Sequence, residues 1–316
     1  MSIVDRALRR RKKIAEWEAN LEELYKKYPR LGEIAHLLAQ ISLEVVYLQM
    51  GQGKMGLTLE ELNKKRTALL NEKKALFEKY ALPENIEAVK WDCPLCEDRG
   101  FLNVGEKCAC LLAEESQQRW ELSGLGPRQK KQTFNSFSLK WYEDKKRYRT
   151  ILEECVSFAE NICRGKAVDN LLLCGNIGTG KTHLCSAIAN YVLQAGISVA
   201  YLKIGILMDL IREAKYNFDS QVVRPINRLQ SLYQVDLLII DDLGTEVVSD
   251  FVREQLFYLI DERLNFHLPW IISTNLSLNE IGTLYEDRLS DRILGTSTVL
   301  KFTGASIRQQ LKVLRG

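Results

Sequence analysis

The stretch that decides the fold of this chain is Gly175-Asn176-Ile177-Gly178-Thr179-Gly180-Lys181-Thr182. It fits the pattern Gly-x-x-x-x-Gly-Lys-Ser/Thr at every fixed position. An apolar run, Asn170–Cys174, precedes it, and residues 183–194 follow with apolar side chains at helical spacing. A glycine loop between a strand and a helix is the context that a phosphate-binding loop requires. The sequence therefore predicts a nucleotide site here, and a chance match is the alternative.

Each part of this loop has a chemical task. Glycines let successive backbone N–H groups converge on phosphate oxygens, and the helix N-terminus adds a favourable dipole. Lys181 is expected to reach the β- and γ-phosphates of ATP, and the Thr182 hydroxyl to hold Mg²⁺. We place His183, which follows directly, with the nucleotide-binding residues, in a packing or hydrogen-bonding role rather than a catalytic one.

Two carboxylates follow a second apolar strand candidate, Leu237–Ile240. They are Asp241 and Asp242, and they stand at the C-terminal end of the strand, where ligands bind in open α/β sheets. Asp241 is expected to bind Mg²⁺, directly or through water, and Asp242 to orient or activate the attacking water. A solvated Asp-Asp turn is the alternative, which the phosphate loop makes less attractive.

Two further polar residues follow apolar or loop segments. Asn275 comes after the strand candidate Ile271–Thr274 and could position the lytic water, although an asparagine that only forms a turn is the alternative. Arg308 follows Ser306, a candidate N-cap of the last helix, and could touch the nucleotide phosphates. Its alternative is an ordinary surface arginine.

A pair of arginines lies on a predicted helix before the last strand. Arg288 and Arg292 are four residues apart and share a face. An arginine supplied in trans can neutralise charge on the phosphates in the transition state. Because Asp287 and Asp291 have the same spacing, a charge ladder along the helix is the alternative.

Strands alternate with helices from about Thr133 to the C-terminus. A helix is predicted at 145–163, and strands at 170–174, 198–203, 236–241, 270–274 and 298–302. This alternation predicts a parallel sheet covered on both faces, an α/β fold. We expect the nucleotide-binding domain to span residues 133–316.

The first part of the chain has a helical pattern. Pro29 is expected to divide residues 1 to about 50 into two helices, and glycines make a loop near residue 53. Thr58 to Glu61 is a capping box that opens a helix to about Tyr80. We expect residues 1–90 to form an α-helical hairpin that binds a partner. Residues 123–132, with their glycines and basic side chains, have the composition of a linker.

Four cysteines dominate residues 91–122, where we expect a knuckle followed by a short helix. They are Cys93, Cys96, Cys108 and Cys110. Two close pairs of thiolates fit tetrahedral Zn²⁺ in a structural role. An iron–sulfur cluster and unliganded thiols are the competing interpretations. The other four cysteines are expected to be buried as small apolar side chains.

Composition excludes few functions. The net charge of +3 is nearly neutral, so it gives no argument about nucleic acid, although Arg6 to Lys13 form a basic cluster and no acid follows Ile293. The cluster is either a solvated helix start or a contact for nucleic acid or an acidic partner. No export signal and no apolar run of about 20 residues are visible, and we expect a reducing cytoplasm.

The combination of motifs from about Gln132 onward resembles AAA+ ATPases of the DnaC/DnaI/IstB-like family. The resemblance is carried by the phosphate loop through Leu184 and by the segments Phe134–Phe137, Asp241–Glu246, Ser273–Leu276, Asp291–Ile293 and Gly304–Arg308. It implies that Asn275 is the sensor 1 residue, Arg292 the arginine finger and Arg308 the sensor 2 arginine. The usual acidic pair of AAA+ proteins is Asp-Glu, so Asp242 departs from it, and slow hydrolysis is expected.

The resemblance also implies a function, that of a bacterial helicase loader. Such a protein hydrolyses ATP to ADP and phosphate, associates with itself through the AAA+ interface, and places a replicative hexameric DNA helicase on single-stranded DNA. Loaders resembling DnaI also place a zinc site before the ATPase domain. An IstB-like transposition helper and an adaptor that binds ATP without hydrolysis are the alternatives.

Overall fold

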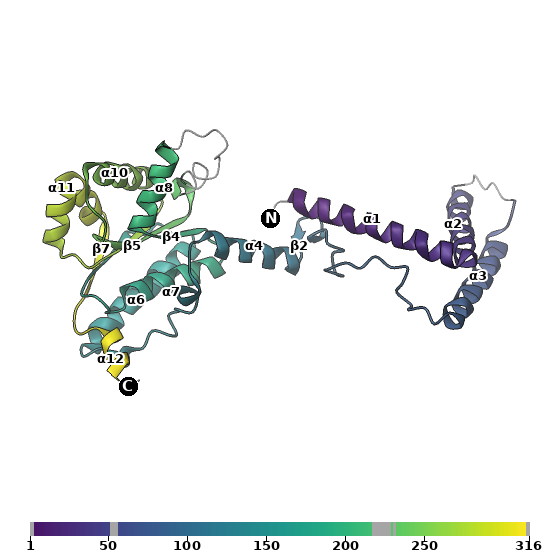
Figure 1. The fold of residues 1–316 in the computed structure, drawn as a ribbon, viewed down its shortest axis with the longest axis horizontal. Coiled ribbons are helices and arrows are strands. Elements are labelled where there is room, and N and C mark those ends of the chain that lie inside the picture. Colours follow the sequence, from purple (N-terminus) through teal and green to yellow (C-terminus); the bar gives the residue numbers. More distant parts are fainter. Residues whose placement is uncertain (1–2, 51–55, 217–228, 230–231, 314–316) are drawn as a thin grey trace. The chain divides into compact units, whose positions relative to one another are not determined.

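The computed structural model describes residues 3–50, 56–216, 229 and 232–313. The chain forms two compact units, Met1–Ala113 and Glu114–Gly316, and the division falls within helix α4 (Ala109–Leu122) (Figure 1). We call them the N-terminal unit and the α/β unit. Most of the predicted glycine loop, residues 51–55, lies outside the described residues.

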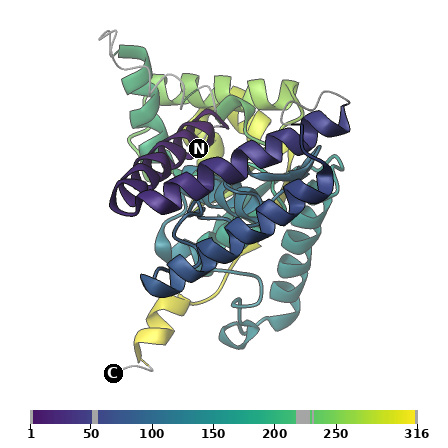
Figure 2. The ribbon, with the colours of Figure 1, turned by 90° about the vertical axis from the view of Figure 1, so that its right-hand side faces the viewer.

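Three long helices make up most of the N-terminal unit. They are α1 (Ile3–Lys27), α2 (Pro29–Gln49) and α3 (Leu59–Lys79). The predicted break at Pro29 and the predicted capping box are confirmed: Thr58 N donates to Glu61 Oε2 at 2.8 Å, and Glu61 N donates to Thr58 Oγ1 at 3.3 Å. Helices α2 and α3 pack side by side, with Leu31 and Leu62 fully buried (Figure 2).

Helix α2 corrects one expectation. Among the described residues it is the one helix whose length and composition would suffice to cross a membrane, with 22% of its most apolar window buried. The sequence-based estimate missed it because the charged residues Glu33 and Glu44 interrupt the apolar run. One such helix is weak evidence for a membrane span, because core helices of soluble proteins can have the same length and composition.

A short antiparallel hairpin closes the N-terminal unit. Strands β1 (Phe101–Asn103) and β2 (Glu106–Lys107) pair between the two cysteine pairs. The turn that joins them contains Gly105, whose φ of +84° lies in the left-handed region that glycine adopts without strain. The hairpin therefore returns the chain so that the second cysteine pair meets the first.

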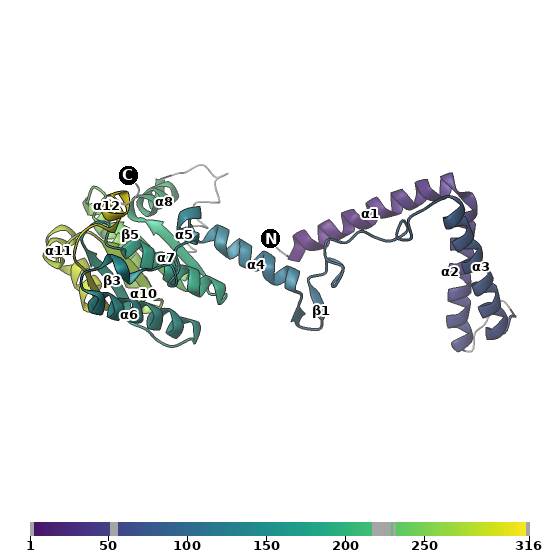
Figure 3. The ribbon, with the colours of Figure 1, turned by 90° about the horizontal axis from the view of Figure 1, so that it is seen from below.

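A five-stranded sheet forms the centre of the α/β unit, as predicted (Figure 3). Its strands are β3 (Asn170–Gly175), β4 (Val199–Lys203), β5 (Leu237–Leu243), β6 (Trp270–Thr274) and β7 (Ser297–Phe302), in the order β4-β5-β6-β3-β7. Every neighbouring pair is parallel. The carboxyl ends of the strands consequently share one edge of the sheet.

Helices cover both faces of this sheet. One core contains side chains of α6 (Lys145–Cys163) and α7 (Lys181–Gln194), and the other contains those of α8 (Ile204–Tyr216), α10 (Asp250–Asn265) and α11 (Leu278–Gly295). Alternate strand residues serve the two cores, as Leu171 and Leu172 illustrate. A short last helix, α12 (Ile307–Val313), follows β7.

Residues 123–132, expected to be a linker, instead belong to the α/β unit. Leu125 is buried in its core, and Tyr201 N on β4 donates to Ser123 O at 2.7 Å. Helix α5 (Pro127–Lys130) packs against α7, and a 3₁₀ turn, η1 (Leu139–Trp141), follows. Composition misled here because glycines and basic residues also suit a segment laid along a domain surface.

Candidate active site and candidate metal centre

Strand order brings the sequence motifs together. Strand β6 lies between β3 and β5, so the phosphate loop after β3, Asn275 after β6 and the acidic pair at the end of β5 are neighbours. No connection along the chain requires this arrangement. It arises because the strand after β5 inserts beside β3 rather than adding to the edge of the sheet.

The glycines of the loop meet both a conformational and a steric need. Gly175, Gly178 and Gly180 have φ values of +126°, +77° and +103°. A Cβ atom would lie 1.9 Å from Phe302 O at Gly175 and 2.2 Å from Ser306 Oγ at Gly178. The loop can therefore pack against the end of β7 and the segment after it only because these positions lack side chains.

Lys181 is buried within its own loop. Its Nζ donates to Gly175 O at 2.6 Å, to Asn176 O at 2.7 Å and to Asn275 Oδ1 at 2.8 Å. Burial lowers the pKa of Lys181, and the carboxylates of Asp242 and Asp241 oppose that shift. The amine thus sits where oxygen acceptors converge, and phosphate oxygens would compete for the same position.

Asp241 is 1% exposed and accepts hydrogen bonds from hydroxyl groups. Tyr201 OH donates to its Oδ2 at 2.7 Å, Thr182 Oγ1 to its Oδ1 at 3.3 Å, and Ser273 Oγ also to Oδ1. Burial raises the pKa of Tyr201, so its hydroxyl keeps the proton that it donates. The carboxylate is thereby satisfied although it is removed from water.

Asp242 has a different environment. Its φ of +61° bends the chain where β5 ends, and its backbone N–H donates to Ser273 Oγ at 3.1 Å. The side chain is 32% exposed, and its Oδ2 lies 3.7 Å from Lys203 Nζ. The two adjacent acids therefore differ, since one is buried and fixed while the other faces an open cavity.

The phosphate loop, the acidic pair and Asn275 all line one cavity of about 710 Å³. Predicted residues that line it are Ile177, Gly178, Gly180, Lys181, Thr182, His183, Asp241, Asp242, Asn275 and Arg308. Lys203, Thr245 and a wall formed by residues between 128 and 142 also line the cavity, and the sequence did not predict them. That wall includes Trp141 and Tyr142, and no local sequence signal marks them as cavity residues.

His183 holds that wall in place. Its Nε2 lies 3.0 Å from Thr133 O and 3.1 Å from Ser136 Oγ, and its ring meets Phe137 edge-on. Burial lowers its pKa. The contacts agree with the packing and hydrogen-bonding role that the sequence suggested, while the residue also lines the cavity.

The chain after β7 closes the other side of the loop. Ile307 N donates to Gly178 O at 2.9 Å, and Asn176 Nδ2 donates to Gly304 O at 3.1 Å. Arg308 is exposed and lines the cavity from the first turn of α12. It therefore has access to a ligand on the phosphate loop.

Arg292 lies elsewhere. Neither Arg292 nor Arg288 belongs to the described residues that line the cavity. Arg292 Nε donates to Asp261 Oδ1 at 2.9 Å, and both guanidinium groups stand over the Phe257 ring, at 4.2 Å for Arg288 and 6.0 Å for Arg292. The charge ladder with Asp287 and Asp291 was the alternative, and the contacts of the two arginines are instead with Asp261 and Phe257 on α10.

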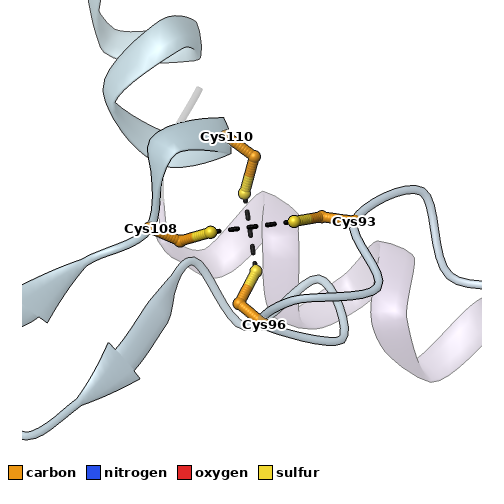
Figure 4. Close-up of side chains that lie close together, drawn as sticks. All are labelled: Cys93, Cys96, Cys108 and Cys110. Atoms are coloured by element: carbon orange, nitrogen blue, oxygen red, sulfur yellow. Dashed lines mark hydrogen bonds between the residues drawn. The ribbon is translucent and has the colours of Figure 1, made fainter.

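The N-terminal unit contains a separate cysteine cluster (Figure 4). The sulfur atoms of Cys93, Cys96, Cys108 and Cys110 all lie within 4.8 Å of one another. Two of these distances are 3.7 Å (Cys93 to Cys108) and 3.4 Å (Cys96 to Cys110). Zinc–sulfur bonds of about 2.3 Å in a tetrahedron place sulfur atoms about 3.8 Å apart. The cluster is thus compatible with a zinc knuckle.

The N-terminal basic cluster is partly explained by this knuckle. Arg6 Nη1 donates to Cys110 Sγ at 3.5 Å, Arg10 Nε donates to Glu97 O at 3.2 Å, and Lys13 Nζ pairs with Asp98 at 3.0 Å. These three basic residues share one face of α1. That face binds the chain's own knuckle, an interpretation that the sequence analysis did not consider.

Comparison with known proteins adds a family match. A model of IstB-like ATP-binding proteins matches residues 129–314. The replicative helicase loader DnaC of Buchnera aphidicola (subsp. Acyrthosiphon pisum) is 30% identical over 166 residues, which cover 52% of this chain and 65% of that protein, somewhat under two thirds of its length. DnaC of Escherichia coli (strain K12) is 26% identical over 200 residues, which cover 63% of this chain and 78% of that protein.

Solved structures resemble a similar share of the chain. A crystal structure of the DnaC helicase loader matches with 23% identity and a TM-score of 0.47, covering 56% of this chain and 100% of that one. A crystal structure of DnaI matches with 22% identity and a TM-score of 0.45. The match covers 58% of this chain and 94% of that one.

Proposed function

Because this chain belongs to the family of IstB-like ATP-binding proteins, we propose that it hydrolyses ATP in order to load a replicative hexameric helicase onto single-stranded DNA. Its α/β unit is an AAA+ P-loop domain with a parallel five-stranded sheet. The loader role is supported by the similarity to DnaC proteins, whose names state that role. We expect the protein to act in the cytoplasm, where replication takes place.

One observation carries the proposed hydrolysis: Lys181, Asn275 and the acidic pair meet at one cavity. Lys181 would hold phosphate oxygens, Asn275 would orient the attacking water, and Asp242 would accept its proton. Thr182 and Asp241 offer hard oxygen atoms 3.3 Å apart, a donor set that fits Mg²⁺. Bound Mg²⁺ would neutralise phosphate charge during the transfer.

Arg292 would complete the site of a neighbouring subunit. Its side chain is 45% exposed and does not line the cavity of its own chain, as an arginine acting in trans requires. Its pair with Asp261 would have to open when subunits associate. Self-association through the AAA+ surface is therefore part of the proposal, and Arg308 would contact the phosphates from within the same chain.

The cysteine cluster would hold structural zinc. Four sulfur ligands leave no coordination position for a substrate. The Cys96 sulfur accepts a hydrogen bond from Gly100 N at 3.3 Å, and Arg6 places positive charge beside Cys110, as a site with four thiolates favours. The metal would fix the knuckle against α1, so its proposed task is to shape the N-terminal unit.

The N-terminal unit is the proposed docking module for the helicase. Leu43 and Val46 on α2 and Met50 at its C-cap follow one another at helical spacing and are 59%, 45% and 68% exposed. An exposed apolar stripe of this kind suits a partner with an apolar groove. Basic residues toward the C-terminus, among them Lys301 and Arg308, would contribute to a path for single-stranded DNA.

Phosphate release tests the proposed enzyme. Turnover of ATP by the full chain, with and without single-stranded DNA, is expected to exceed that of a Lys181→Ala variant. Release no faster than that of the variant would favour an adaptor that binds ATP without hydrolysis, an alternative that the short side chain of Asp242 keeps open.

Affinity purification tests the proposed partner. The full chain should retain a hexameric helicase, and Leu43→Glu with Val46→Glu should weaken the retention, whereas Lys64→Glu on the exposed face of α3 should not. Retention of a transposase in place of a helicase would refute the loader role and favour a transposition helper.

A further inference from the structure

Strand β4 contacts both acids of the candidate active site, and the motifs discussed so far give it no role there. It pairs in parallel with β5, with Tyr201 opposite Ile239 and Lys203 opposite Asp241. Tyr201 and Lys203 are two residues apart, so their side chains extend from the same face of the strand. The edge strand of the sheet therefore aims two polar side chains at the site.

The tyrosine fixes the orientation of the buried acid. Tyr201 is 3% exposed, and its hydroxyl donates to Asp241 Oδ2 at 2.7 Å. The other oxygen, Oδ1, is thereby left facing Thr182. Rotation of the carboxylate would break the hydrogen bond with Tyr201 inside a buried region, which is unfavourable. Tyr201 thus sets which oxygen is available beside the phosphate loop.

The lysine faces the exposed acid. Lys203 Nζ lies 3.7 Å from Asp242 Oδ2, and both side chains line the cavity. Asp242 already has its backbone held by Ser273, so its short side chain retains rotation about χ1 and χ2 as its main freedom. The ammonium group of Lys203 attracts the Asp242 carboxylate. This attraction restricts the side-chain rotation and favours the orientation in which Oδ2 faces Lys203.

The backbone of β4 is itself anchored at this point. Tyr201 N donates to Ser123 O at 2.7 Å, and Gly124 packs so closely that a Cβ atom there would lie 2.4 Å from Tyr201 O. An edge strand has one free side for hydrogen bonds, and here residues 123 and 124 occupy it at Tyr201. The position of the tyrosine is therefore set from both sides of the strand.

We propose that Tyr201 and Lys203 are positioning residues of the ATPase site: Tyr201 orients Asp241 toward the metal of the nucleotide, and Lys203 holds Asp242 beside the attacking water. The Lys203 part rests on the proposed hydrolysis. The Tyr201 part requires only that nucleotide binds with Mg²⁺. The two parts can consequently be tested by different measurements.

Binding of a fluorescent N-methylanthraniloyl derivative of ATP at increasing Mg²⁺ concentration tests Tyr201. Tyr201→Phe removes one hydroxyl, and loss of a hydrogen bond to a metal-ligating carboxylate typically weakens metal affinity 10- to 100-fold. We expect the Mg²⁺ concentration for half-maximal binding to rise at least about 10-fold, while binding without Mg²⁺ is unchanged. Tyr191→Phe, on an exposed part of α7, is the matched control and should behave as wild type.

Two results would overturn the role of Tyr201. One is an unchanged Mg²⁺ requirement in Tyr201→Phe. The other is an equal loss of nucleotide binding with and without Mg²⁺, because that outcome would make the residue purely structural.

Steady-state hydrolysis tests Lys203. Lys203→Met is expected to lower kcat about 10-fold or more, with KM changed less than about twofold, because the interaction matters mainly in the transition state. Lys203→Arg should restore most of the rate, since it returns the positive charge. Lys166→Met, at an exposed turn, is the matched control.

The outcomes separate this inference from the proposed function. Wild-type rates in Lys203→Met, or a rise in KM alone, would refute the role of Lys203. Absence of turnover in the wild type would refute the proposed hydrolysis and the role of Lys203 with it. The Mg²⁺ titration would still decide the role of Tyr201.

Discussion

A glycine in the segment that sequence interpreted as a linker provides the sharpest test of the fold. Gly124 has a φ of +79°, and a Cβ atom added there would stand 2.4 Å from Tyr201 O. Gly196 is a matched position in the same unit, with a φ of +91° and no atom within 4 Å of such a Cβ. Comparing Gly124→Ala with Gly196→Ala therefore isolates the steric contact from the cost of the left-handed backbone.

The expected magnitudes follow from these two terms. An alanine in the left-handed region costs about 1–2 kcal/mol, and the stiffer unfolded chain offsets about 0.4–1 kcal/mol. Gly196→Ala should therefore lose about 1 kcal/mol of the free energy of unfolding. At Gly124 the overpacking adds about 1–3 kcal/mol, for a total of about 2–4 kcal/mol.

Calorimetric unfolding of the full chain measures the difference. For a unit of about 200 residues, 1 kcal/mol corresponds to roughly 2–4 °C in Tm. Gly196→Ala should lower Tm by about 2–4 °C, and Gly124→Ala by about 4–16 °C. Equal shifts for the two variants would contradict the packing of residues 123–124 against β4 and would restore the linker interpretation.

Three further outcomes are expected. Arg292→Ala should spare ATP binding and abolish hydrolysis in steady-state assays, whereas equal loss of both would indicate that the arginine acts within its own subunit. Cys96→Ser should reduce zinc from about one ion per chain to none in elemental analysis, with Cys163→Ser as the control that keeps it; metal-free wild type would refute the knuckle. The backbone N–H of Thr58 lowers the pKa of Glu61 below 4.5, so the capping box should stabilise α3 fully above that pH and lose its effect as pH falls through the lower folded-state value. Unfolding at about pH 6 and about pH 3 should show a smaller acid effect in Glu61→Gln, and an identical acid effect would count against the capping box.

Local patterns predicted what local physics determines. The phosphate loop needs glycines at fixed positions, and Gly175 and Gly178 have positive φ values with no room for a side chain. The capping box at Thr58 is likewise complete within four residues. Strands were located to within about two residues because buried parallel strands are continuous apolar runs.

Contacts between distant segments could not be predicted in this way. The basic residues Arg6, Arg10 and Lys13 have the spacing of a solvated helix face, and their acidic and sulfur partners lie more than 80 residues away. Within the cavity wall from residues 128–142, the segment Phe134–Phe137 was singled out as part of the family resemblance, and no pattern marked the wall as lining the cavity. Tyr201 in a buried strand has the pattern of a core residue, and its hydrogen bond to Asp241 depends on the register between β4 and β5.

Residues from the central strands and residues from the edge strands have different expected roles in the site. This difference predicts how substitutions will change Mg²⁺ affinity and the rate of hydrolysis. The residues expected to perform chemistry lie at or just after the carboxyl ends of β3, β5 and β6, which pair on both sides and are therefore held firmly. The residues that position them come from the two edges: β4 supplies Tyr201, and the segment after β7 supplies Ser306, which lies against Gly178. Each edge strand pairs with one neighbouring strand, and at Tyr201 residues 123 and 124 hold the free side of β4. Because Tyr201 and Ser306 act through other groups, substitutions there should change Mg²⁺ affinity and rate by moderate factors. Removal of Lys181, the first residue of α7, or of Asp241 on β5 should eliminate function.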